Sequence, residues 1–145
     1  IPVIGGSWGV TAVAMSIEVS QPAPEIGKRP TARPIDMMHL TKQALGEVGL
    51  EGEILRNFDE ILTAHFDRLE GSGTVPELLH HLHIIRGASV GVGAWSLAEH
   101  AHVMETELNE GEPVNPERVE DIHFAVEEAR AFVVRRIAEN DAEIS

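Results

Sequence analysis

Three residues near the middle of the chain, His83, Arg86 and Gly87, have types and spacing that suit nucleophilic chemistry toward phosphorus. At helical spacing they share one face with His80 and Val90. A different face is predicted to be buried and carries Leu78, Leu82, Ile85, Ser89 and Val92. An exposed neutral imidazole is a competent nucleophile near pH 7, and an arginine one turn away would place a permanent cation beside a phosphoryl group. We therefore predict that His83 points outward.

Gly87 lies one helical turn beyond His83, at a position where glycine lowers the stability of the helix. A glycine inside a helix is less favourable than alanine by about 1 kcal/mol. Without a side chain at this position, a bulky partner could approach the imidazole closely. The sequence therefore predicts that a nucleophile, a cation and free space lie together on one exposed patch.

The pattern His-x-Ile-Arg-Gly-Ala-Ser-x-x-Val-Gly-Ala runs from His83 to Ala94. It resembles the signature of histidine-containing phosphotransfer (HPt) domains, which usually reads His-x-Leu-Lys-Gly-Ser-(Ser/Ala)-x-x-Leu-Gly-Ala. The resemblance covers the chain from about Pro34 to its C-terminal end. It continues through positions that look like the family's following helix: Leu97, Ala98, Ala101, Met104 and Glu105.

The resemblance implies a phosphocarrier more than an enzyme. His83 would accept a phosphoryl group, on Nε2, from the aspartyl phosphate of a receiver domain and pass it to another receiver. Arg86, in place of the family's usual lysine, would stabilise the phosphoryl oxygens, and Gly87 would give the partner access. The receiver would supply Mg²⁺, so the chain itself needs no cofactor.

The apolar residues predict an all-α fold, because no alternating β pattern occurs after Pro34. A short helix starts at Asp36 as N-cap, has Leu45 on its apolar face and stops near Gly46. Four long helices of roughly 18 to 25 residues follow, each amphipathic. Short connections between them predict an antiparallel up-and-down four-helix bundle with a short extra N-terminal helix, as the resemblance also implies.

The ends of the long helices are marked by turn and capping residues. The first runs from Leu50 to Leu69, with Leu50 and Ile61 among its apolar positions. The helix that carries His83 is predicted to start at Thr74, with Glu77 in a capping box, and to be broken by Gly91 and Gly93. The next ends near Gly111, and the last runs from the N-cap Asn115 to about Asn140.

Residues 1–33 are predicted to be a disordered or extended segment, and residues 34–145 a single domain. Four prolines lie between residues 22 and 34, which is typical of a linker. The apolar run of residues 1–16 is interrupted by glycines and is too short to span a membrane. Met15 could be the natural start of the chain.

Composition limits the classes of partner. The chain of 145 residues has 24 acidic and 11 basic residues and a formal charge of −13, which would repel nucleic acid and anionic membranes. It has no cysteine, which excludes disulfides and thiolate metal sites and fits a cytoplasmic setting. No strand precedes the glycines near His83, so a nucleotide site of the kinase type is not expected.

Two other functions stay open from the sequence. The bundle could serve only as a docking module that no longer transfers phosphate. It could also bind a metal through histidines, since five of them occur on two successive predicted helices: His80, His81, His83, His100 and His102. Near the His83 patch, Val90 and Trp95 could contact a receiver, although Trp95 could equally pack in the core, whereas Ser89 is predicted to be a small helix-packing residue.

Overall fold

The computed structural model describes residues 33–144, which form five helices and no strand. These are α1 (Met37–Gln43), α2 (Val48–Glu70), α3 (Val75–Val92), α4 (Trp95–Asn109) and α5 (Pro116–Ile144). The predictions made for the segment before Arg33, including a start at Met15, lie outside the described residues. The predicted all-α class is confirmed.

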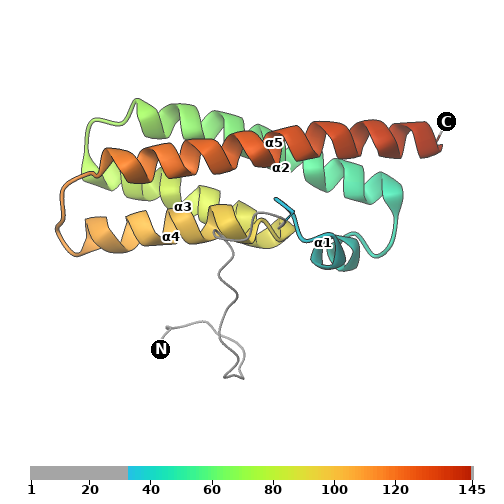
Figure 1. Cartoon of the computed structure of the whole chain (residues 1–145), viewed down its shortest axis with the longest axis horizontal. Helices are drawn as coiled ribbons and strands as arrows, with labels where there is room; N and C mark the ends of the chain where they lie inside the picture. Colours follow the sequence, from blue (N-terminus) through green and yellow to red (C-terminus); the bar gives the residue numbers. More distant parts are fainter. Residues whose placement is uncertain (1–32, 145) are drawn as a thin grey trace, which may run out of the picture. The chain divides into compact units, whose positions relative to one another are not determined.

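The four long helices run up and down, each antiparallel to the next along the chain (Figure 1). Helix α3 packs on α2 and α4, and α5 packs on the same two helices from the other side. Helix α1 lies at the end of the bundle where α2 begins and α3 ends, and it packs on both (Figure 1). The predicted bundle with a short extra N-terminal helix is therefore confirmed.

Aliphatic side chains from all four long helices and α1 build one core. Its largest fully buried members include Phe58, Leu62, Leu82, Met104 and Ile122. The stripe predicted for α3 is buried in full, because all five of its residues face this core. None of the described helices is both long and apolar enough to cross a membrane.

Several predicted details of the helices were wrong. Leu45 lies beyond the end of α1 with φ +56° and its side chain is 80 % exposed, so it is part of a turn. Leu50 and Ile61 are only half-buried, while Phe66, absent from the predicted face, is buried. The lengths of α4 and α5, 15 and 29 residues, fall outside the predicted range.

The ends of α3 explain why this helix is held firmly. The Thr74 hydroxyl accepts a hydrogen bond from the Glu77 amide at 3.3 Å, and the Glu77 carboxylate accepts one from the Gly73 amide at 3.0 Å. Gly91, predicted to break the helix, lies within it. The helix ends at Gly93, whose φ of +83° favours glycine and whose added Cβ would lie 2.9 Å from Cβ of Asp36.

Candidate functional site

The His83 side chain is 70 % exposed on the outer face of α3. Its neighbours in the chain explain this orientation, because Leu82 and Ile85 are fully buried and fix the rotation of the helix. Ser89 is also fully buried, and its hydroxyl donates a hydrogen bond to the Ile85 carbonyl at 2.7 Å. Ser89 is thus a packing residue, as the sequence predicts.

Arg86 is held in place by a carboxylate of the neighbouring helix. Its Nε donates to Oε1 of Glu105 on α4 at 2.5 Å, and its Nη2 lies 3.4 Å from Nδ1 of His83. Only 28 % of the Arg86 side chain and 12 % of the Glu105 side chain are exposed. A charge-assisted bond of this kind fixes the guanidinium beside the imidazole while the bond to Glu105 persists.

Glu105 also approaches the imidazole itself. Its Oε2 lies 3.7 Å from Nδ1 of His83, which is an ion-pair distance if the ring is protonated. Both Arg86 and Glu105 therefore meet the same ring nitrogen. Nδ1 faces the protein, and neither residue contacts Nε2, the other nitrogen of the ring.

Gly87, one helical turn beyond His83, has free space where a side chain would lie. A Cβ added at this position would meet no heavy atom within 4 Å, so packing inside the protein gives no reason for a glycine. The residue is exposed and lies within a helix, where glycine is unfavourable. Gly91 of the same helix is equally open, so what distinguishes Gly87 is its place one helical turn from His83, where a docking partner would meet no side chain.

An apolar groove follows Gly87 along the outer face between α2 and α3. It has a volume of about 260 Å³ and is lined mainly by small and aliphatic side chains, among them Ile54, Ile61 and Ala88. Val90, which follows on α3, is 40 % exposed. The groove begins beside Gly87, at Ala88 and Gly91, and its apolar lining could be covered by an apolar partner surface.

Trp95 belongs to the packing of α1 against the start of α4. Its indole Nε1 donates to the Asp36 carboxylate at 3.0 Å, and its ring lies edge-on to His39 with centroids 5.0 Å apart. The bond from Trp95, followed by the His39 amide, lowers the pKa of Asp36. The sequence left two locations open for Trp95, and the structure favours this structural one.

The other histidines do not gather around His83. His80 and His81 instead meet His65 of α2, with Nδ1 of His65 and His81 3.0 Å apart. Burial, and then the neighbouring cationic groups, lower the pKa of both His65 and His81. Within residues 33–144, no three histidine or carboxylate side chains converge on a point where a metal ion would fit.

Sequence reasoning missed the role of Glu105 and the acidic residue buried at the far side of the bundle. Glu105 was noted only as part of a motif, and its contact with Arg86 joins residues 19 apart on two helices.

Glu51 is 4 % exposed and receives hydrogen bonds from Arg136 and Asn140 of α5. Its place on the apolar face of α2, one turn before Leu55, was a signal that could have been used.

Comparison with protein families matches residues 51–132 to the Hpt domain, which covers more than half of the chain and includes His83, Arg86, Gly87 and Glu105. Searches among curated proteins and among solved structures gave no match. The matched region spans the site on α3 and its supporting carboxylate on α4. The chain therefore belongs to the Hpt domain family, whose members act with receiver domains in the histidine phosphotransfer of phosphorelays.

Proposed function

We propose that His83 is the phosphoryl carrier of this protein, which accepts the group from an aspartyl phosphate of one receiver domain and passes it to the aspartate of another. The observation that carries this proposal is the arrangement around one exposed imidazole: Arg86 is fixed beside it by Glu105, and Gly87 leaves the approach open. The docking-only alternative gives no role to this arrangement.

In the proposed reaction, the Nε2 lone pair of His83 attacks phosphorus in line with the bond to the receiver's aspartate. A nitrogen–phosphorus bond forms, and the bond between phosphorus and the carboxylate oxygen breaks, so that the aspartate leaves with the electron pair. The attack requires the neutral tautomer whose proton is on Nδ1, and because this proton stays there the phosphorylated ring carries a positive charge. In the second transfer, another aspartate attacks phosphorus and the neutral imidazole leaves.

Arg86 and Glu105 would contact the same ring nitrogen, Nδ1, in two different states of His83. The guanidinium can only donate, so its 3.4 Å contact with Nδ1 of His83 requires a lone pair there and corresponds to a resting tautomer with the proton on Nε2. Before Nε2 can attack, this exposed ring must release the Nε2 proton to water and take up a proton on Nδ1. A phosphoryl group would draw Nη2 away toward its oxygens, while Nε remains on Glu105. Nδ1 could then hold the proton and turn it toward Oε2 of Glu105, 3.7 Å away.

The Mg²⁺ expected in this chemistry would be held by the receiver. The partner would cover the patch at Gly87 and the apolar groove between α2 and α3. A cytoplasmic location is part of the same proposal, because receiver domains exchange phosphoryl groups with soluble partners. The organisation as an N-terminal extension, residues 1–33, followed by one domain, residues 34–145, is likewise proposed.

The test is incubation of the full chain with a panel of phosphorylated receivers. We expect a labelled protein whose phosphoryl group is labile in acid and stable in alkali, and His83→Gln should abolish the label while circular dichroism stays unchanged. His80→Gln is the matched control, since His80 is exposed on the same helix and should label as the wild type does.

The outcomes separate the proposal from its alternative. Label that persists in His83→Gln would move the carrier to another histidine and overturn the proposed site. Receivers that bind the wild type without transferring any label would favour the docking module. Transfer of the label from purified phosphoprotein to a second receiver would complete the proposed relay.

A further inference from the structure

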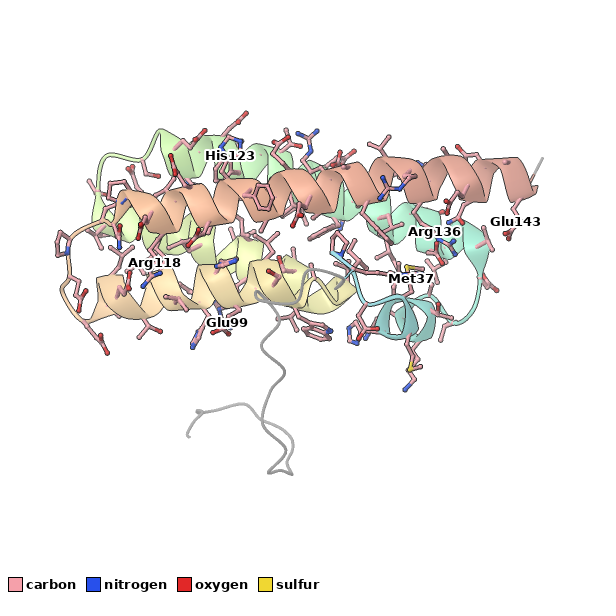
Figure 2. The ribbon with its side chains drawn as sticks, viewed as in Figure 1. Met37, Glu99, Arg118, His123, Arg136 and Glu143 are labelled. Carbon is pink, nitrogen blue, oxygen red and sulfur yellow. The ribbon has the colours of Figure 1, made fainter. Side chains whose placement is uncertain are left out.

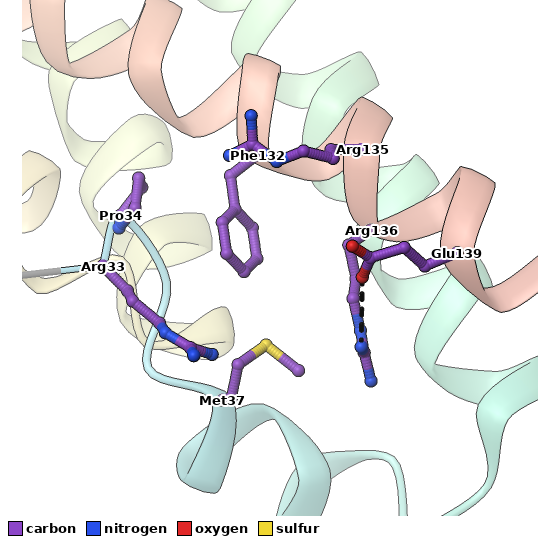
Figure 3. A pocket seen from close by; sticks show the side chains of 7 residues that line it. All are labelled: Arg33, Pro34, Met37, Phe132, Arg135, Arg136 and Glu139. Carbon is purple, nitrogen blue, oxygen red and sulfur yellow. Dashed lines mark hydrogen bonds and ion pairs between the residues drawn. The ribbon is translucent and has the colours of Figure 1, made fainter.

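A second pocket lies between the segment that leads into α1 and the C-terminal half of α5 (Figure 3). Its volume is about 470 Å³, larger than that of the groove beside Gly87. Arg33 and Met37 line one side, and Phe132, Arg135, Arg136 and Glu139 line the other. None of these residues takes part in the proposed transfer at His83.

Within residues 33–144, two of the three arginines in this pocket have no carboxylate partner. Arg136 is already engaged, since its Nε donates to Glu51 at 2.7 Å and its Nη1 to Glu139 at 3.4 Å. Arg33 and Arg135 have no ion pair with any residue from 33 to 144. In a chain with a formal charge of −13, two guanidinium groups in one pocket that pair with none of the described carboxylates favour an anionic ligand.

The pocket also offers apolar surface between its charges. Figure 3 shows the Phe132 ring extending into the space between Arg33 and Arg136, with the Met37 thioether opposite. Both Phe132 and Met37 are half-buried and pack against the core. A small inorganic anion would leave this surface in water, whereas an aromatic or branched group would cover it.

We propose that this pocket binds a small organic anion that joins one carboxylate or phosphate group to an aromatic or branched apolar body. The volume lies within the range of small-molecule sites, about 300–1,000 Å³. The anionic group would meet Arg33 or Arg135, which line the pocket from different segments, and the apolar body would lie against Phe132 and Met37. Glu139 at the wall would disfavour ligands with several negative charges.

The methyl group of Met37 allows a direct test by NMR of the full chain labelled with ¹³C at the methionine methyls. Benzyl phosphate serves as the probe, and inorganic phosphate and benzyl alcohol each supply one half of its chemistry. We expect a saturable shift of the Met37 methyl with benzyl phosphate and binding at least about tenfold weaker with either half. The Met104 methyl, in the core and 1 % exposed, is the internal reference.

Variants identify the groups that bind. Arg33→Gln combined with Arg135→Gln should weaken binding of benzyl phosphate at least about tenfold. Arg68→Gln removes an exposed arginine of α2 that lines no part of this pocket, and should leave the affinity unchanged. A Met37 methyl that does not respond, or equal affinity in the double variant, would overturn the proposal.

Discussion

Two of the arginine–glutamate pairs that join helices of this bundle differ in what else the carboxylate contacts. On one side Arg86 of α3 binds Glu105 of α4, and on the other Arg136 of α5 binds Glu51 of α2. Figure 2 labels Arg136 in the second half of α5 and Arg118, which binds Glu107 of α4, at its start. The two arginines of the compared pairs are similarly exposed, at 28 % and 30 % of their side chains.

The carboxylates are used differently. Oε2 of Glu51 accepts from Arg136 at 2.7 Å and from the buried Asn140 amide at 2.6 Å, and Oε1 accepts from Arg136 at 3.4 Å. Glu105 binds Arg86 through Oε1, while among the described residues its Oε2 has only the 3.7 Å contact with His83. The Glu51 pair therefore holds two helices together, whereas the Glu105 pair leaves one oxygen available to respond to the imidazole.

The largest effect on stability is expected when the Glu51 pair is broken. Glu51→Ala leaves the Arg136 guanidinium and the Asn140 amide without their acceptor, and we expect a loss of about 2 to 3 kcal/mol in the free energy of unfolding. Urea unfolding followed by circular dichroism measures it. Glu53→Ala, an exposed site two residues along α2, is the control, and equal losses in the two variants would refute the structural role of Glu51.

Gly87→Gln, near the Arg86–Glu105 pair, should change the phosphotransfer rate without lowering the free energy of unfolding. The variant should be as stable as the wild type or up to about 1 kcal/mol more stable, because glycine is the poorer helix former. Phosphotransfer should slow at least about tenfold, because the new side chain obstructs the approach to in-line attack distance.

The control for this variant is Gly49→Gln in α2, where an added Cβ also meets no heavy atom within 4 Å. It lies in the first turn of α2, so it should gain less stability than Gly87→Gln, and it should transfer at the wild-type rate. Melting temperature and transfer rate are to be measured on the same samples. A stable Gly87→Gln that transfers normally would mean that the partner docks on another face.

Glu105→Gln should have a smaller effect on the transfer rate. The amide still reaches Arg86 but no longer offers a negative charge to Nδ1 of His83, so we expect transfer to slow about tenfold, as when the group that orients a functional histidine is removed. The free energy of unfolding should fall by less than about 1 kcal/mol. Glu99→Gln, exposed on the same helix, is the control. A loss of stability like that of Glu51→Ala, with normal transfer, would make the two pairs equivalent.

The smallest expected effect is on the dependence of stability on pH. Burial raises the pKa of Glu51, but hydrogen bonds from Arg136 and Asn140 and the charge of Arg136 outweigh it and hold the pKa below its usual value of 4.5. A carboxyl group whose pKa is lower in the folded state stabilises the fold above its unfolded pKa, and this contribution is lost as the pH falls through the folded value. Stability should therefore decline below about pH 4.5, and less steeply in Glu51→Gln than in the wild type. Parallel pH profiles of the two proteins would contradict this assignment.

The sequence predicted most of what lies along single helices. Periodicity located the buried face of α3 and hence the outward direction of His83, and the cap at Thr74 gave the start of this helix. The sequence-based prediction was wrong where one residue type is compatible with two local structures. Gly91 reads as a helix breaker but is tolerated inside α3, and Leu45 reads as an apolar helix position but lies in the turn after α1.

Contacts between helices could not be predicted from the sequence. Arg86 and Glu105 lie on different helices, and their pairing depends on the register in which α3 and α4 run antiparallel. The same holds for Glu51, whose partners lie 85 and 89 residues away on α5. The arginine pocket depends on where the segment before α1 meets α5, which no local pattern fixes.

The central claim, that Nε2 of His83 carries the phosphoryl group beside an Nδ1 that faces Glu105, can be tested on the phosphorylated protein itself. The measurement is ¹⁵N NMR of the histidine-labelled chain after transfer from a phosphorylated receiver, with His83→Gln used to assign the signals. The account predicts that one imidazole changes, that it is His83, and that phosphorus is bound to Nε2 with the proton on Nδ1. Phosphorus on Nδ1 of His83, or on any other histidine, would contradict it.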